Sequence, residues 1–304
     1  MPRSTPLYTP TKSGLVNGPL TIACPLPADV PQHLACGNNA VNTMLPAWQP
    51  TGTFAPVLPA LGAPTIGDRL SAKSVDWAWY AGGWSNAAGD KGGPGWTNGG
   101  GADGTACTDP NAATGAIIPY CPDKLFQPHH QPFNYYSNYA PGMPARAAHL
   151  RDEEEFQQLV QGSGTSCQLR PVSFVKPLGE ENEHPGYASE HQGSTHLVDL
   201  LQAIEGSSCA GDTMVVVTYD EFGGQWDHVS PPGQGSSRGP HDVWGPGTRV
   251  PALILTPFLE EPFVVDHREH DTTSILATVE HRFGLQPLGS RDAKVPDLSS
   301  VFEE

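Results

Sequence analysis

The chain contains no long apolar run. Nowhere in its 304 residues does an apolar stretch approach the ~20 residues that a helix needs to cross a bilayer. The first ten residues, MPRSTPLYTP, also lack the apolar segment that follows the positive charge in a secretory signal. The sequence therefore predicts no transmembrane segment, and no signal peptide is visible in it.

Basic residues are scarce. The chain has 16 Lys and Arg against 32 Asp and Glu, a formal net charge of −16, and no basic run. Proteins that bind nucleic acid hold the phosphate backbone with clustered Lys and Arg. The charge balance therefore argues against a nucleic-acid partner.

The six cysteines lack the close-paired spacing of a zinc site, so we expect disulfides. About 15 pairings are possible. The shortest loops would pair neighbours along the chain, namely Cys24 with Cys36, Cys107 with Cys121, and Cys167 with Cys209. Disulfides indicate an oxidising compartment, which conflicts with the lack of a signal peptide. A missing N-terminal segment would reconcile the two observations.

Glycine and proline are abundant, at 34 and 32 residues, which predicts much surface loop. An apolar share of 38% in 304 residues is enough for one large α/β domain. Residues 1–63 are rich in proline and weakly periodic, so we expect an irregular arm there and the core at 64–304. The Gly-, Asn- and Ala-rich residues 82–115 predict a surface insertion in that core.

The stretch that organises the core is residues 214–229, MVVVTYDEFGGQWDHV. Residues 214–218 are apolar and mostly β-branched, as expected of a central strand buried on both faces. Asp220 and Glu221 follow directly, and a glycine pair then ends the strand. In open α/β sheets, ligands bind outside this carboxyl edge of the strands.

Two adjacent carboxylates oppose each other's ionisation unless a cation or a donor lies nearby. A divalent metal ion at Asp220 and Glu221 is the simplest remedy, and Asp227 and His228 could supply further ligands. The alternative is that the Asp-Glu-x-Gly-Gly stretch is only a polar turn.

A second polar loop follows another short buried strand, at residues 172–176. This loop, residues 179–187, holds His184 directly before a proline. A helix that begins at Ser194 and runs to about Glu205 would then lead back to the central strand. Such a right-handed strand-helix-strand unit places His184 and Asp220 on the same edge of the sheet.

Two histidines, His129 and His130, lie between prolines ahead of an aromatic cluster, so we expect a stiff loop that presents them. The alternative is a loop that packs them against tyrosines. The remaining elements that the sequence predicts are helices at 65–73, 151–161 and 271–284 and strands at 75–80 and 249–257.

The strings NEHPGYAS, VVVTYDEFGGQWDHVSPP, WGPGTRVPALILTP and DTTSILATVEHRFGL occur in this order. They resemble the C-terminal half of the bacterial phosphoesterase family that includes acid phosphatases and phosphocholine-preferring phospholipases C. TIGDRLSAKSVDWAWYAGGW and FQPHHQPFNYY resemble its middle. The resemblance implies an α/β fold of the alkaline-phosphatase-like type, a three-layer α/β/α sandwich, and metal-dependent hydrolysis of phosphate esters.

The resemblance also implies roles for single residues. Asp220 and Glu221 match the family's metal-binding carboxylates. His184 matches the histidine of the Glu-His-Pro motif that lines its phosphate site, and His130 matches the histidine that precedes its aromatic cluster. The metal would be a divalent ion of open identity, and the substrate a small phosphate ester. A divalent ion offsets charge on phosphoryl oxygens, and imidazoles donate to them or protonate the leaving alkoxide.

The preferred function is an acid-phosphatase-like phosphomonoesterase, with an extracellular or periplasmic location for the full-length parent. Phospholipase C is the first alternative, disfavoured because no membrane-binding amphipathic helix or apolar patch is evident. The second is a non-catalytic remnant of the fold that binds metal without turnover.

The chain departs from the family pattern near its start. Family members begin with a strand that ends in a metal-binding Glu-Asn pair, and a later Ser-bearing turn gives the nucleophile. Neither is recognisable here, since Glu181 and Asn182 lie in a different loop. We therefore expect the family's N-terminal part to be lacking, with an unpaired edge or groove beside the 214–218 strand.

Overall fold

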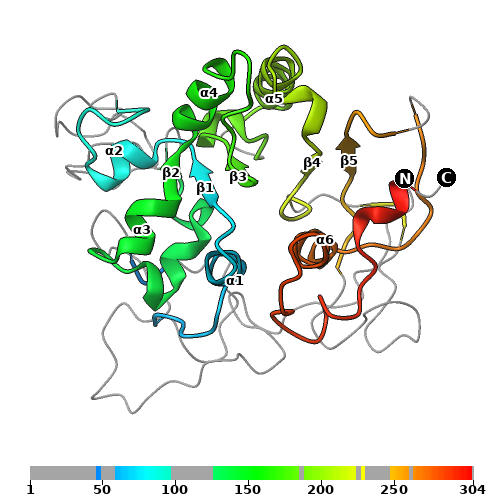
Figure 1. Ribbon diagram of the computed structural model, residues 1–304, viewed down its shortest axis with the longest axis horizontal. Coiled ribbons are helices and arrows are strands. Elements are labelled where there is room, and N and C mark those ends of the chain that lie inside the picture. Colours follow the sequence, from blue (N-terminus) through cyan, green and yellow to red (C-terminus); the bar gives the residue numbers. More distant parts are fainter. Residues whose placement is uncertain are drawn as a thin grey trace, which may run out of the picture. The chain divides into compact units, whose positions relative to one another are not determined.

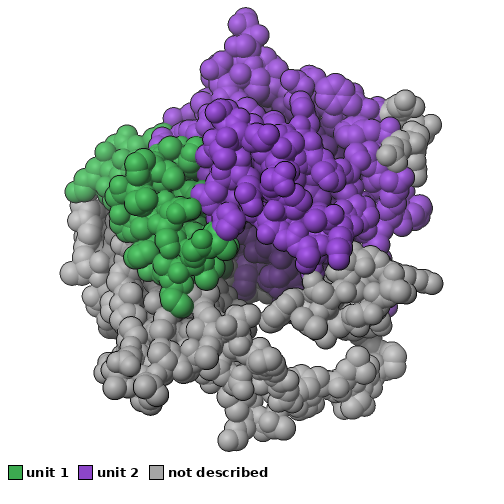
Figure 2. Space-filling view, turned by 60° about the horizontal axis from the view of Figure 1, so that its bottom comes forward, with its two compact units in different colours: residues 1–63, 83–150 green, residues 64–82, 151–304 purple. Residues whose placement is uncertain are grey.

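A computed structural model describes residues 46–48, 59–96, 126–184, 188–223, 227–229, 247–259 and 263–302. The chain divides into two compact units, residues 1–63 with 83–150 and residues 64–82 with 151–304 (Figure 2). Most of the expected arm, 1–63, and the expected insertion from residue 97 onward lie outside the described residues. The boundary between arm and core therefore stays a prediction.

The larger sheet has the strand order β2-β1-β3, with β2 at Leu150–Asp152, β1 at Trp77–Ala81 and β3 at Val172–Lys176 (Figure 1). β1 and β3 are parallel, with Trp77 opposite Val172 and Ala81 opposite Lys176. Four of the five β1 residues are buried. The predicted α/β class is confirmed, because the sheet contains parallel strands and helices pack against it.

The helices around this sheet are α1 (Ile66–Ala72), α4 (Glu153–Gln161) and α5 (Glu190–Glu205). α1 begins at a capping box, in which the Thr65 hydroxyl accepts the Asp68 amide and the Asp68 carboxylate accepts the Thr65 amide. Asp152 caps α4 by accepting the Glu154 amide. The helix predicted at 151–161 therefore begins at Glu153, and Arg151 belongs to β2 instead.

The start predicted for α5 is wrong. Ser189, and not Ser194, is its N-cap, because its hydroxyl accepts the Gln192 amide at 3.2 Å. Ser194 lies inside the helix, which leaves its hydroxyl available for a contact outside it.

The core of this unit joins β1 to both long helices. Tyr80 of β1 packs edge-to-face on Phe156 of α4, with ring centroids 5.5 Å apart. Val215, at the start of the next strand in the chain, packs against the same cluster. The buried members of the cluster are Ala78, Tyr80, Phe156, Val160, Ile204 and Cys209.

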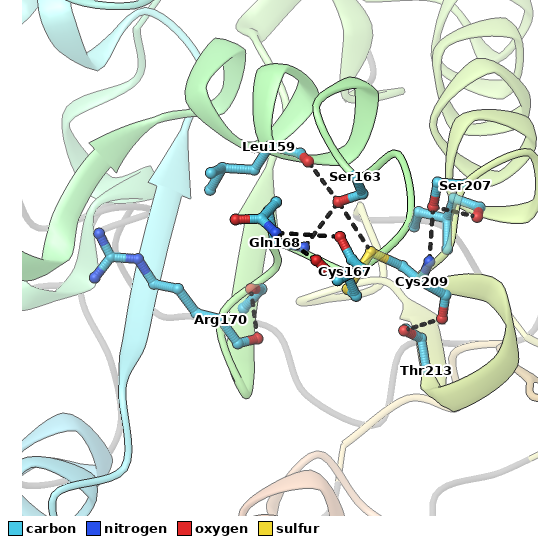
Figure 3. The surroundings of a disulfide bond; sticks show 11 residues. Leu159, Ser163, Cys167, Gln168, Arg170, Ser207, Cys209 and Thr213 are labelled. Carbon is cyan, nitrogen blue, oxygen red and sulfur yellow. Dashed lines mark hydrogen bonds between the residues drawn. A yellow bond between two sulfur atoms is a disulfide. The ribbon is translucent and has the colours of Figure 1, made fainter.

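One predicted disulfide, Cys167–Cys209, is confirmed and closes a sequence separation of 42 residues (Figure 3). The Ser163 hydroxyl beside it donates to the Leu159 carbonyl at 2.7 Å and accepts the Gln168 amide at 2.8 Å. The other four cysteines lie outside the described residues.

A second, smaller sheet corrects two expectations. β4 (Val215–Thr218) pairs antiparallel with β5 (Ala252–Leu255), and these two strands make up the whole sheet within the described residues. Every residue of β4 is partly exposed, and three of the four β5 residues are exposed. Two predictions were therefore wrong: the buried central strand at 214–218 and the buried strand at 249–257. An apolar run has the composition of a buried strand, but burial also requires neighbours on both faces.

Within the described residues, β5 is the only strand paired with β4, and the unpaired edge that the sequence predicts there stays a prediction. The C-terminal helix α6 (Thr273–Phe283) ends at Gly284, whose φ of +61° is the left-handed cap expected there. None of the helices in the described ranges is long and apolar enough to cross a membrane.

The other unit is built from short helices. The insertion expected at 82–115 begins with α2 (Trp84–Ala88), which is a buried helix and not a surface loop. Trp84 packs against Phe126. The Arg146 guanidinium of α3 (Pro144–His149) lies over the Trp84 ring, 4.8 Å from its centroid. The 3-10 helices η1 to η3 span Pro128–His130, Pro132–Tyr135 and Ser137–Tyr139. Those in the other unit are η4 (Gly179–Glu181), η5 (Ala210–Asp212) and η6 (Leu298–Phe302).

Gly82, directly after β1, lies against the chain beyond β3. Its amide donates to the Lys176 carbonyl at 2.9 Å, and a Cβ added to it would lie 2.5 Å from the Leu178 backbone nitrogen. We expect Gly82→Ala to lower the free energy of unfolding by about 1–3 kcal/mol, because backbone must shift to admit the methyl group. Urea denaturation measures this loss. The control is Gly211→Ala, where a Cβ meets nothing within 4 Å, and equal stabilities of the two variants would contradict the prediction.

Glu280 of α6 is buried, with 2% of its surface exposed. Burial and the neighbouring Asp292 carboxyl raise the pKa of Glu280 to about 7. The folded chain thus holds a proton that the unfolded chain releases near pH 4.5. Stability from this group is present below that pH and is lost as the pH rises towards 7.

We therefore expect Glu280→Gln to flatten the fall in stability between about pH 4.5 and 7, because glutamine does not ionise. Urea denaturation at a series of pH values measures this. Glu205→Gln, at an exposed position, is the control. A fall of unchanged steepness in Glu280→Gln would refute the assignment.

Candidate active site

The carboxyl ends of β3 and β4 lie together. Lys176, the last residue of β3, donates from Nζ to Asp220 Oδ2 at 2.9 Å, two residues beyond β4. β3 and β4 belong to different sheets, however, so the single parallel strand-helix-strand unit predicted for them is not observed within the described residues. The two strand ends contact each other without pairing, because the long Lys176 side chain reaches Asp220.

The Asp220 carboxylate is both charged and accessible. Partial burial favours its neutral form, but the Lys176 ammonium and nearby backbone amides outweigh this and hold the pKa of Asp220 below its usual value. About 60% of the side chain remains exposed. A ligand from solvent can therefore reach this carboxylate.

Glu221 also lies open to solvent, in the turn that ends the strand. Its Oε2 accepts the Gly223 amide at 2.7 Å, and Gly223 has a φ of +62°, which explains the glycine at this place. Asp227 is held by Arg249, with Nε 3.0 Å from Oδ2. The His228 Nδ1 lies 3.3 Å from the same carboxylate, so these two predicted extra ligands face each other and an arginine.

The loop after β3 brings His184 to this edge. η4 leads into it, and the exposed His184 donates its amide to Asn182 Oδ1 at 3.0 Å. The preceding residue, Glu183, accepts a hydrogen bond from the hydroxyl of Tyr219. The immediate neighbours of His184 and Asp220 therefore contact each other.

His130 belongs to the other unit, residues 1–63 with 83–150. It is 5% exposed and packs edge-to-face on His129, with ring centroids 4.6 Å apart. Both histidines lie in η1, so the stiff loop expected here is a 3-10 turn. Pro128 occupies its first position, where the missing amide of proline removes no helical hydrogen bond. The catalytic role of His130 stays a prediction.

Residues 39–286 match the Phosphoesterase family. The chain belongs to this family. It is 34% identical over 159 residues to "Phospholipase C B" of Mycobacterium tuberculosis, a match that covers 44% of this chain and 29% of that protein. It is 30% identical over 156 residues to "Non-specific phospholipase C6" of Arabidopsis thaliana, covering 45% and 29%.

A third relative is "Non-hemolytic phospholipase C" of Burkholderia pseudomallei, 28% identical over 184 residues that cover 50% of this chain and 25% of that protein. The chain therefore matches less than a third of the length of these relatives. The phosphoesterase resemblance seen in the sequence is confirmed, and these relatives carry the names of phospholipases C.

The chain also contains a cluster of polar side chains that the sequence did not reveal. His196 of α5 lies between two carboxylates, with Nε2 2.7 Å from Glu153 Oε1 and Nδ1 3.3 Å from Glu181 Oε2. Burial alone would lower the pKa of His196, but the hydrogen bond and charge of Glu153, with the charge of Glu181, raise it. This is the geometry of an imidazolium held by two carboxylates.

The same three side chains offer ligand atoms within 4.8 Å of one another, so they could hold a metal ion instead. They come from α4, η4 and α5, which are far apart in the sequence, and no local motif joins them. Only the tertiary contact of α4 with α5 reveals them. Asp220 and Glu221 stay the proposed metal ligands at the strand edge.

Proposed function

We propose that this chain belongs to a metal-dependent hydrolase of phosphate esters, with its chemistry at the edge shared by β3 and β4. The observation that carries this is the contact of Lys176 with Asp220, beside the contact of Tyr219 with Glu183, in a member of the Phosphoesterase family. These contacts pair an ionised carboxylate with a lysine and join the residue before His184 to the residue before Asp220.

The side chains at this edge suit both a divalent ion and a phosphate ester. Asp220 and Glu221 are accessible hard oxygen donors, which fit a divalent ion, and such an ion would neutralise charge on the phosphoryl oxygens. Lys176 adds a second positive group beside Asp220. The exposed His184 imidazole could donate to a phosphoryl oxygen or to the leaving alkoxide. We assign no nucleophile.

For the substrate, we propose the phospholipase C alternative over the phosphomonoesterase that the sequence favours. The sequence argument against a lipid substrate was that no apolar patch is evident. β5 and the chain after it expose large apolar side chains, with 57% of Leu253, 56% of Phe258 and 81% of Phe263 open to solvent. Exposed apolar groups of this kind suit contact with a lipid surface, and the relatives are named phospholipases C.

The test is hydrolysis by this chain of phosphatidylcholine vesicles and of a chromogenic phosphomonoester, each with and without a chelator, from pH 5 to 8. We expect the vesicle lipid to be cleaved faster and both activities to vanish with chelator. A faster monoester reaction would restore the acid-phosphatase-like assignment. A folded chain that binds metal and cleaves neither substrate would instead show the non-catalytic alternative.

A further inference from the structure

Glu183, the residue before His184, has a backbone conformation that side chains rarely adopt. Its φ is +64°, in the left-handed region that favours glycine. Residues other than glycine persist there when the surrounding contacts determine their conformation, often at functional sites. Contacts with the surrounding structure must therefore hold Glu183 in this conformation.

Three residues from two segments constrain the Glu183 side chain. Its Oε1 accepts the Ser194 hydroxyl of α5 at 2.9 Å, and its Oε2 accepts the hydroxyl of Tyr219, which follows β4. Gly193 lies beneath it, and a Cβ at Gly193 would fall 2.1 Å from Glu183 Cγ. α5 therefore needs glycine at this position to let Glu183 approach.

These contacts join the two halves of the site. Glu183 precedes His184 on the loop after β3, and Tyr219 precedes Asp220 at the end of β4. The hydrogen bond from the Tyr219 hydroxyl to Glu183 therefore links these two segments directly.

We propose that Glu183 is a positioning residue for phosphate-ester hydrolysis, tying the loop that carries His184 to the strand end that carries Asp220. This rests on the proposed function, since it assigns Glu183 a part in the same site. A displacement of about 1 Å between reacting groups can cost about 100-fold in rate. A side chain that fixes two site loops to each other therefore affects turnover without contacting the substrate.

The kinetic test compares Glu183→Ala, Glu183→Gln and Tyr219→Phe with Glu205→Ala, an exposed glutamate at the far end of α5. We expect kcat for Glu183→Ala to fall about 10- to 100-fold with little change in KM. Glu183→Gln keeps an acceptor oxygen for Tyr219 and should recover most of this loss. A Glu183→Ala enzyme within twofold of the control, or a loss confined to KM, would overturn the proposal.

Amide hydrogen exchange at His184 tests the same link without activity. We expect exchange about tenfold faster in Glu183→Ala and Tyr219→Phe, the size expected for the loss of one or two net hydrogen bonds. Unchanged exchange would overturn the positioning role. If the wild-type chain cleaves no phosphate ester but exchange still quickens, the proposed function fails while the structural link stands, so the two failures are distinguishable.

Discussion

Replacing Asp220 with asparagine is expected to lower phosphate-ester hydrolysis by about 100-fold or more. The substitution keeps the size of the side chain but removes the charge that faces Lys176 and that a divalent ion would require. Losing one preorganised electrostatic group from an active site costs about 100- to 1,000-fold in other enzymes. Initial rates on the preferred substrate measure this effect, with circular dichroism to show that the variant folds.

Asp212→Asn is the matched control, because Asp212 is an exposed aspartate just before β4. It should retain full activity. Bound metal, measured by mass spectrometry, should fall in Asp220→Asn and persist in His196→Gln. The reverse result would place the ion at Glu153, Glu181 and His196 and refute a metal-binding role for Asp220.

Removing the disulfide with Cys167→Ser and Cys209→Ser should lower the free energy of unfolding by about 4 kcal/mol. The estimate follows from the loop that the bond closes in the unfolded chain, a separation of 42 residues. Cys209 is fully buried in the cluster that joins β1, α4 and α5. The loss should therefore reach the packing that supports the site, and urea denaturation measures it.

Reductant provides the internal control for this prediction. The wild-type chain should approach the stability of the double variant when reduced, whereas the double variant should change far less on reduction. A loss below about 1 kcal/mol would mean that the bond does little to restrict the unfolded chain.

Local signals in the sequence determined the elements whose limits depend on neighbouring residues. The capping box of Thr65 and Asp68 fixes the start of α1, and Gly284 fixes the end of α6. The apolar runs that form β1 and β3 were correctly predicted as strands. The strand-helix-strand unit predicted to place Asp220 and His184 at one sheet edge does not form within the described residues, because β3 and β4 lie in different sheets.

Tertiary structure decided everything that depends on a partner far away in the sequence. The run 214–218 looks buried by composition, but the single described strand beside β4 leaves it partly exposed. Glu153, Glu181 and His196 share no motif and meet only where α4 and η4 reach α5. The positioning role proposed for Glu183 likewise depends on its hydrogen bonds with Ser194 and Tyr219. Propensity and capping act within a few residues, whereas burial and side-chain networks arise only when distant segments pack.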